Sequence, residues 1–127
     1  AGHRLSTAEM EEAVSGHKDV AECCVVGIED DLKGQIPFGL VVLKSGTQIS
    51  ETEVEKEVVA LVREKIGAVA ALRNIVVVKR LPKTRSGKIL RKLIRTMLDG
   101  KEFQIPSTID DEAIIGELQE KFEEYRK

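Results

Sequence analysis

The residues best suited to chemistry lie in one short basic run, residues 81–88, with the sequence L-P-K-T-R-S-G-K. Pro82 and Gly87 are typical of a turn. Such a turn would place Lys88 at or just before the first turn of a following helix, where the helix dipole disfavours a cation. A residue that conflicts with a local structural preference, as a cation does at the start of a helix, is often part of a functional site. We therefore predict that this loop delivers Lys88 to an anionic reaction centre. Its ammonium would stabilise charge developing on a phosphoryl or carboxylate group without being consumed.

Two other interpretations fit part of this run. A phosphate-binding P-loop has a glycine five residues before the glycine of its Gly-Lys pair and a Ser or Thr after the lysine. This chain has Pro82 and Ile89 at those positions, so the P-loop interpretation fails. Residues 79–95 also contain eight basic residues and no acidic one, a pattern that an ordinary solvated helix face can produce. If the same basic stripe bound nucleic acid or another polyanion, this chain alone would show salt-dependent binding.

Composition argues against several classes of function. The chain has 127 residues, 42% of them hydrophobic, which fits one ordinary domain. Its 20 basic and 22 acidic residues give a net charge of -2, so no overall bias toward nucleic acid or a membrane surface exists. Aromatic residues make up only 3%, with no Trp, which leaves few side chains for stacking bases. Since Ala1 leads almost at once into a capped helix, we expect a piece excised from a longer protein.

Apolar spacing predicts the elements that would position the loop. Two β-branched, apolar strands are predicted over residues 20–28 and 36–43, joined as a hairpin with a long polar loop. A third strand, residues 74–78, is apolar without interruption and leads directly into the loop. Helices are predicted near residues 7–15, 50–66, 89–98 and 109–125, the first two with the capping-box pairs Ser6 and Glu9, and Ser50 and Glu53.

The predicted fold class is α+β, a small three-stranded sheet with packed helices. Residues 106–127 form a C-terminal tail with an amphipathic helix, whose apolar stripe we expect to cover the domain's own core rather than a partner. Cys23 and Cys24 are adjacent within an apolar strand and are interpreted as reduced core residues. His3 and His17 are the only histidines and have no metal-type partner at ligand spacing, so no metal site is predicted.

Three stretches of sequence resemble the C-terminal domain of the adenylate-forming superfamily, which includes acyl-CoA synthetases, luciferases and nonribosomal adenylation domains. The string L-P-K-T-R-S-G-K-I-L-R-K resembles its last core motif, and the opening A-G-H-R-L-S-T-A-E-M-E is similar to the motif that follows its interdomain hinge. Between them, G-I-E-D-D-L-K-G-Q-I-P-F-G-L-V-V-L resembles the second and third strands of that domain. The match covers residues 1–105. G-H-R with K-T-R-S-G-K looks most like short-chain acyl-CoA synthetases acting on acetate or propionate, and the tail P-S-T-I-D-D is similar to the propionate type.

This resemblance implies that residues 1–105 are a mobile lid on a larger N-terminal adenylation domain, which binds ATP and the carboxylic acid. In one pose of the lid, the lysine matched by Lys88 contacts the carboxylate and the α-phosphate while acyl-adenylate forms. Lys88 is therefore expected to be catalytic and to bind ATP. Arg4 matches the arginine that contacts the nucleotide phosphates.

The second pose of the lid serves the transfer of the acyl group to coenzyme A. The face around Gly2 and His3 would then line the tunnel for the pantetheine arm. Arg63 matches the arginine that pairs with coenzyme A phosphates, a role that suits the guanidinium group. Some short-chain members hold a magnesium ion in the loop matching residues 15–20, although that stretch is more simply a helix-ending turn.

The resemblance also implies the activity of the whole enzyme. It would be an AMP-forming acid-thiol ligase that uses ATP, coenzyme A and a Mg²⁺ ion bound with ATP through the N-terminal domain, and the isolated chain would be inactive. Acylation of Lys88 would switch the enzyme off by removing its charge. A eukaryotic relative of the propionate type would work in the mitochondrial matrix, and a bacterial one in the cytoplasm.

Overall fold

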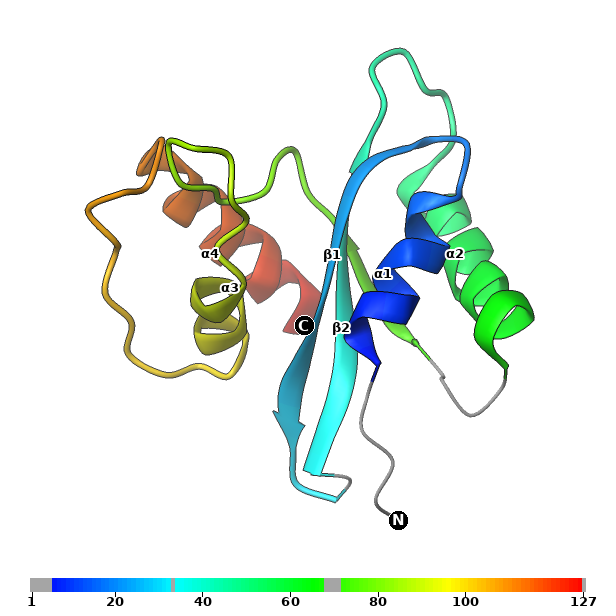
Figure 1. The fold of residues 1–127 in the computed structure, drawn as a ribbon, viewed down its shortest axis with the longest axis horizontal. Coiled ribbons are helices and arrows are strands. Elements are labelled where there is room, and N and C mark those ends of the chain that lie inside the picture. The colour runs from blue at the N-terminus through cyan, green and yellow to red at the C-terminus, as the bar shows by residue number, and fades with distance from the viewer. Residues whose placement is uncertain (1–5, 33, 68–71, 127) are drawn as a thin grey trace.

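Three strands form the middle layer of the fold in this computed structural model, which describes residues 6–32, 34–67 and 72–126. Strands β1 (Val20–Asp30) and β2 (Gly34–Leu43) pair in antiparallel fashion, and β3 (Asn74–Val77) lies parallel to β2. The order in the sheet is β1-β2-β3 (Figure 1). The predicted α+β class with a three-stranded sheet is therefore confirmed.

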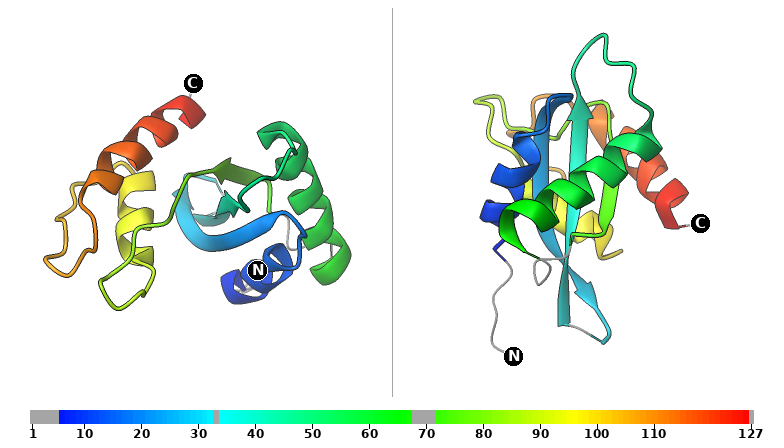
Figure 2. Two further views of the ribbon diagram at one scale, coloured as in Figure 1. Left: turned by 90° about the horizontal axis from the view of Figure 1, so that it is seen from above. Right: turned by 90° about the vertical axis from the view of Figure 1, so that its right-hand side faces the viewer.

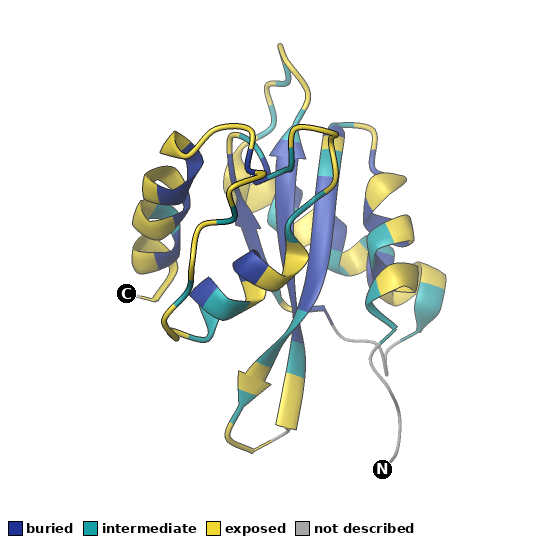
Figure 3. Cartoon of the chain, turned by 60° about the vertical axis from the view of Figure 1, so that its left-hand side comes forward, coloured by how far each residue is buried: buried dark blue, intermediate teal, exposed yellow. Residues whose placement is uncertain are grey.

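The hairpin between β1 and β2 is longer, and its loop shorter, than predicted. Pairing continues through the polar residues as far as Asp30 and Gly34, so that only residues 31–33 separate the strands. The prediction of a long loop was wrong because backbone pairing does not require apolar side chains. The end of the hairpin projects beyond the helices, where polar side chains remain in water (Figure 3).

Helices cover both faces of the sheet. Helices α1 (Thr7–Ser15) and α2 (Glu51–Ile66) lie on one face, and α3 (Arg91–Leu98) and α4 (Ala113–Arg126) on the other (Figures 1 and 2). Alternation along the strands divides the core accordingly. Cys23 and Val25 pack with α1 and α2, whereas Cys24 and Val26 pack with α3 and α4.

The tail helix α4 packs on the domain itself. Its buried residues Ile114, Ile115, Leu118 and Phe122 belong to the same hydrophobic cluster as the sheet and α3. The ring of Phe122 meets that of Phe38 edge to face, with centroids 6.3 Å apart. The expectation that this apolar stripe covers the domain's own core is confirmed. No helix within the described ranges has both the length and the apolar character that a membrane crossing requires.

Several helix ends differ from the predictions. The Ser6 side chain makes no capping hydrogen bond, so the first capping box is not formed, whereas Ser50 accepts a hydrogen bond from the Glu53 N–H at 3.1 Å. Helices α3 and α4 begin later than apolar spacing suggested. Ile89 and Ile109 were predicted to be the first apolar residues of these two helices. Each instead pairs with a residue of the loop at residues 83–84.

Candidate functional site

The loop that carries Lys88 is a tight turn closed by its own hydrogen bonds. The Thr84 N–H donates to the Lys88 carbonyl at 2.8 Å, and the Gly87 N–H donates to the Thr84 carbonyl at 2.9 Å. The Thr84 hydroxyl oxygen accepts from the Lys88 N–H at 3.1 Å and lies 2.9 Å from the Ser86 hydroxyl. Gly87 has a φ of 92°, in the left-handed region that favours glycine. The backbone of Lys88 is therefore fixed, while its side chain is exposed.

Lys88 lies just before the helix that follows, one of the two predicted placements. The N-cap of α3 is Leu90, whose N–H donates to the Pro82 carbonyl at 2.9 Å. Since the helix dipole acts mainly within the first turn, it has little effect on a lysine placed before that turn. Any functional role of Lys88 therefore depends on the residues that surround it.

Lys88 differs from several other basic residues of the stripe at residues 79–95 in that its side chain has no partner inside the described part of the domain. Four of the eight basic side chains have partners inside the domain: Arg80 pairs with Asp111 and Glu117, Lys83 with Glu22, Arg91 with Glu11, and Arg85 donates to the Ser107 carbonyl. The other four, Lys79, Lys88, Lys92 and Arg95, form no ion pair among the described residues, although the charge of Lys79, after the hydrogen bond from Arg80, helps to lower the pKa of Glu117. The stripe is thus no continuous free basic surface, which argues against the polyanion-binding alternative.

A groove of about 610 Å³ runs beside the loop, between α3 and the segment at residues 102–106. Lys88 and Lys92, both without an acidic partner in the described structure, line it together with the apolar side chains of Leu93, Phe103 and Pro106. Lys88 therefore lies beside a partly apolar recess, which Glu102 also lines. A low-dielectric wall beside a cation strengthens its attraction for an anion.

The other predicted site residues lie elsewhere. Arg63 is exposed in the last turn of α2, on the face of the sheet opposite to α3, α4 and the Lys88 loop (Figures 1 and 2). The structure therefore does not bring Arg63 and Lys88 together. Gly2, His3 and Arg4 lie outside the described residues.

The stretch at residues 15–20 forms a helix-ending turn. The N–H groups of Gly16 and His17 donate to the carbonyls of Ala13 and Val14, which satisfies the end of α1. His17 was missed as a structural residue by sequence reasoning. Its buried ring accepts at Nδ1 from the Asp19 N–H at 3.0 Å, so the proton lies on Nε2, which bonds Glu57 Oε1 at 2.7 Å. Within the described ranges, no three His, Cys, Asp or Glu residues are grouped so that they could hold a metal ion.

The two cysteines are free thiols in the core, as predicted. Burial raises the pKa of Cys23 to about 11 and that of Cys24 to about 12, since a thiolate is poorly solvated there. The Cys23 thiol donates to the Glu11 carbonyl at 3.3 Å. Neither sulfur has the lowered pKa that a nucleophilic cysteine needs.

Comparison with known proteins supports the family that the sequence motifs resemble. The model of the family "AMP-binding enzyme C-terminal domain" matches residues 9–88, a stretch that ends on Lys88. An uncharacterized protein of Pseudomonas aeruginosa is 58% identical over 118 residues, which covers 93% of this chain and 19% of that protein. The mitochondrial acyl-CoA synthetase short-chain family member 3 of Mus musculus is 50% identical over 120 residues, covering 94% of this chain and 18% of that protein.

A solved structure of an acyl-CoA synthetase also resembles this chain. The crystal structure of an acyl-CoA synthetase from Brucella canis superposes with a TM-score of 0.69 at 35% identity, covering 76% of this chain and 18% of that one. The chain thus spans 18 to 19% of the length of these relatives. The chain belongs to the family of AMP-binding enzyme C-terminal domains, within which its last matched residue is the exposed Lys88.

Proposed function

We propose that this chain is the C-terminal domain of a short-chain acyl-CoA synthetase. The whole enzyme would use ATP to activate an acid of the acetate or propionate type as acyl-adenylate, and would then transfer the acyl group to coenzyme A. Its N-terminal adenylation domain would supply the pockets for the acid and adenine, together with the Mg²⁺ ion bound with ATP. Family membership and the name of the Mus musculus relative support this proposal.

The observation that carries the proposal is a cation without a partner in the described structure, held on a fixed backbone. Lys88 is exposed on a closed turn, whereas its basic neighbours Lys83, Arg85 and Arg91 are bound inside the domain. In adenylation, a carboxylate oxygen attacks the α-phosphorus of ATP while the bond to the leaving pyrophosphate breaks. Negative charge redistributes over the phosphoryl oxygens during this step, and an ammonium placed there would stabilise it without being consumed.

The second half-reaction would use another side of the domain. We assign Arg63 to the phosphates of coenzyme A, and Gly2 and His3 to its pantetheine arm, while Arg4 would contact the nucleotide phosphates. Because α2 and the Lys88 loop lie on opposite faces of the sheet, a single orientation of the domain would not present both to one active centre. This placement supports a lid, residues 1–105, that turns between two poses, with residues 106–127 as its tail.

The exposure of Lys88 also suggests a means of control. Acylation of its ammonium would remove the charge on which adenylation depends and so stop acyl-adenylate formation. In a eukaryote the enzyme would work in the mitochondrial matrix, as the name of the mouse relative suggests, and in a bacterium it would work in the cytoplasm.

The test replaces Lys88 with Ala in the full-length protein that contains this chain. Acid-dependent exchange of pyrophosphate into ATP should fall on the order of 10²- to 10³-fold, the loss seen when one group that stabilises transition-state charge is removed. Lys79→Ala is the matched control, since Lys79 is also exposed and forms no ion pair in the described structure. Normal acyl-adenylate formation by the Lys88→Ala variant would show that the assignment is wrong.

A further inference from the structure

The C-terminal tail forms an isolated β-bridge with the loop that carries Lys88. Thr84 and Ile109 pair as in an antiparallel sheet. The Arg85 N–H donates to the Thr108 carbonyl at 3.0 Å, and the Asp110 N–H donates to the Lys83 carbonyl at 2.9 Å. In Figure 1 the yellow-green loop and the orange segment before α4 meet at the upper left. Two parts of the chain that are distant in sequence are thus joined at the candidate site.

Backbone hydrogen bonds within the loop connect this bridge to Lys88. On one side of Thr84 lies the tail segment, and on the other its N–H donates to the Lys88 carbonyl at 2.8 Å. Lys83 also pairs with Ile89 in antiparallel fashion. The Arg85 guanidinium adds a bond to the Ser107 carbonyl at 3.1 Å. The tail therefore contacts the backbone that sets where the side chain of Lys88 begins.

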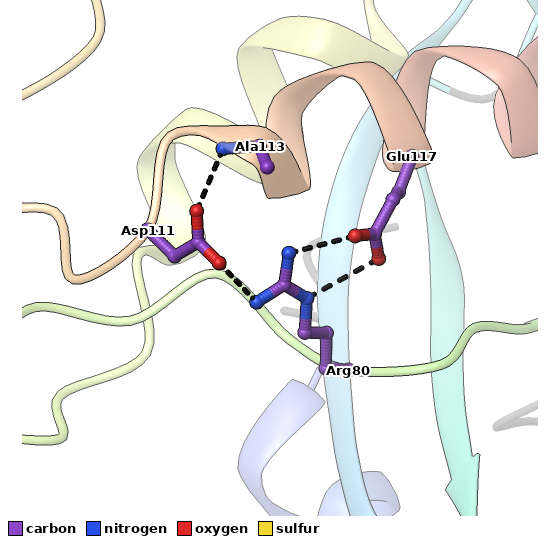
Figure 4. A network of polar contacts seen from close by, with 4 residues as sticks. All are labelled: Arg80, Asp111, Ala113 and Glu117. Carbon is purple, nitrogen blue, oxygen red and sulfur yellow. Dashed lines mark hydrogen bonds and ion pairs between the residues drawn. The ribbon is translucent and has the colours of Figure 1, made fainter.

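The tail segment is held against the rest of the domain by Ile109 and Asp111. Ile109 is buried in the cluster that includes the sheet. Asp111 accepts from the Ala113 N–H at 3.0 Å and pairs with Arg80 at 2.7 Å (Figure 4). The same guanidinium donates to both carboxylate oxygens of Glu117, at 2.7 and 3.2 Å. Because Arg80 lies three residues after the end of β3, this network ties the start of α4 to the segment that leaves the sheet.

We propose that residues 107–111, here named the strap, are a positioning element for Lys88. The strap holds the loop in the conformation from which the lysine reaches the reacting phosphoryl group. This inference rests on the proposed function of Lys88 in adenylation. The lysine needs precise placement, since a misplacement of about 1 Å at a reacting centre can reduce the rate on the order of 10²-fold. The turn's own hydrogen bonds fix its internal shape, but they do not tie it to the rest of the domain, as the strap does.

The sharpest test removes one hydrogen bond between strap and loop in the full-length enzyme. Asp110→Pro eliminates the N–H that donates to Lys83, and proline also favours the extended conformation at Ile109 that pairing requires. Asp110→Ala keeps the N–H and is the matched control, since the Asp110 side chain is exposed. Acid-dependent pyrophosphate exchange by Asp110→Pro should fall on the order of 10- to 10²-fold below that of Asp110→Ala. Transfer of the acyl group from supplied acyl-adenylate to coenzyme A should not change.

Two outcomes would overturn the inference. Equal exchange rates for the Pro and Ala variants would show that the strap does not position the lysine. A parallel loss of both half-reactions would show a merely structural role. Lys88→Ala, measured in the same assays, separates this inference from the proposed function. If Lys88→Ala retains exchange, the proposed function fails; if it loses exchange while Asp110→Pro does not, only the strap inference fails.

A second variant decides the matter if Asp110→Pro does not fold, as judged by circular dichroism and thermal unfolding. Asp111→Asn removes the ion pair with Arg80, and Glu112→Gln removes an equal charge from a neighbouring exposed residue. Exposed ion pairs are weak, so exchange by Asp111→Asn should fall by up to about fivefold, with acyl transfer unchanged. No difference from Glu112→Gln, or an equal loss in acyl transfer, would overturn the inference.

Discussion

A methyl group at Gly87 should impair adenylation without any steric clash. Gly87 has a φ of 92°, and a Cβ atom built there would meet nothing within 4 Å. The change Gly87→Ala therefore acts only through backbone strain, which for an L-residue in the left-handed region is about 1–2 kcal/mol. If the loop relaxes to escape this strain, the ratio of its native conformation to the relaxed one falls by a factor of about 5–30. Adenylation should slow by up to the same factor, because Lys88 follows Gly87 directly.

The control is a glycine with the same geometry in another place. Gly46 has a φ of 80° and open space around a Cβ, and it lies in the exposed connection between β2 and α2. Gly46→Ala should therefore introduce similar strain without slowing adenylation. The assay is acid-dependent pyrophosphate exchange by the two full-length variants, with urea unfolding to compare their stabilities. Equal exchange rates at equal loss of stability would refute the claim that the conformation of the turn at Gly87 matters to the site.

Three further predictions concern other parts of the domain. Arg63→Ala should raise the KM for coenzyme A by roughly tenfold or more, as loss of a hydrogen-bonded charge contact does, and leave pyrophosphate exchange unchanged. Lys65→Ala, in the same helical turn, should change neither quantity. His17→Ala should lower the free energy of unfolding by about 1–3 kcal/mol in urea titrations, because the Asp19 N–H loses its acceptor. Because burial raises the pKa of Cys23 and Cys24 to about 11 and about 12, a thiol reagent at neutral pH should label them only after unfolding.

Each of these predictions has a contradicting result. An effect of Arg63→Ala on pyrophosphate exchange would assign that arginine to the first half-reaction. An unchanged unfolding midpoint for His17→Ala would show that its two hydrogen bonds contribute no net stability. Rapid labelling of the folded protein would show that the cysteines reach solvent.

Sequence patterns located most elements because burial imposes a period on the chain. The apolar run at residues 20–28 predicted a strand with Cys23 and Cys24 in the core, and the structure buries the two cysteines in the clusters on opposite faces of the sheet. The helix at Glu51–Ile66 was equally clear, since Val54, Val58 and Val62 repeat at helical spacing and all are buried. Such patterns record which side chains face the core.

Contacts between backbone groups produce no such pattern of residue types in the sequence. The bond from the Asp110 N–H to the Lys83 carbonyl depends on no side chain, so apolar spacing assigned Ile109 to a helix instead of to the strap. The bond between His17 and Glu57 likewise joins residues that are distant in sequence. The role proposed for the loop came from its resemblance to a family motif, since the P-loop comparison and the basic stripe alone left its purpose open.

The central claim is that Lys88 serves one half-reaction and not the other. The direct measurement compares the wild-type and Lys88→Ala full-length proteins in two assays, acid-dependent pyrophosphate exchange and acyl transfer from supplied acyl-adenylate to coenzyme A. The claim predicts a loss on the order of 10²- to 10³-fold in exchange and an unchanged rate of acyl transfer. Equal losses in both assays, or unchanged exchange, would contradict it.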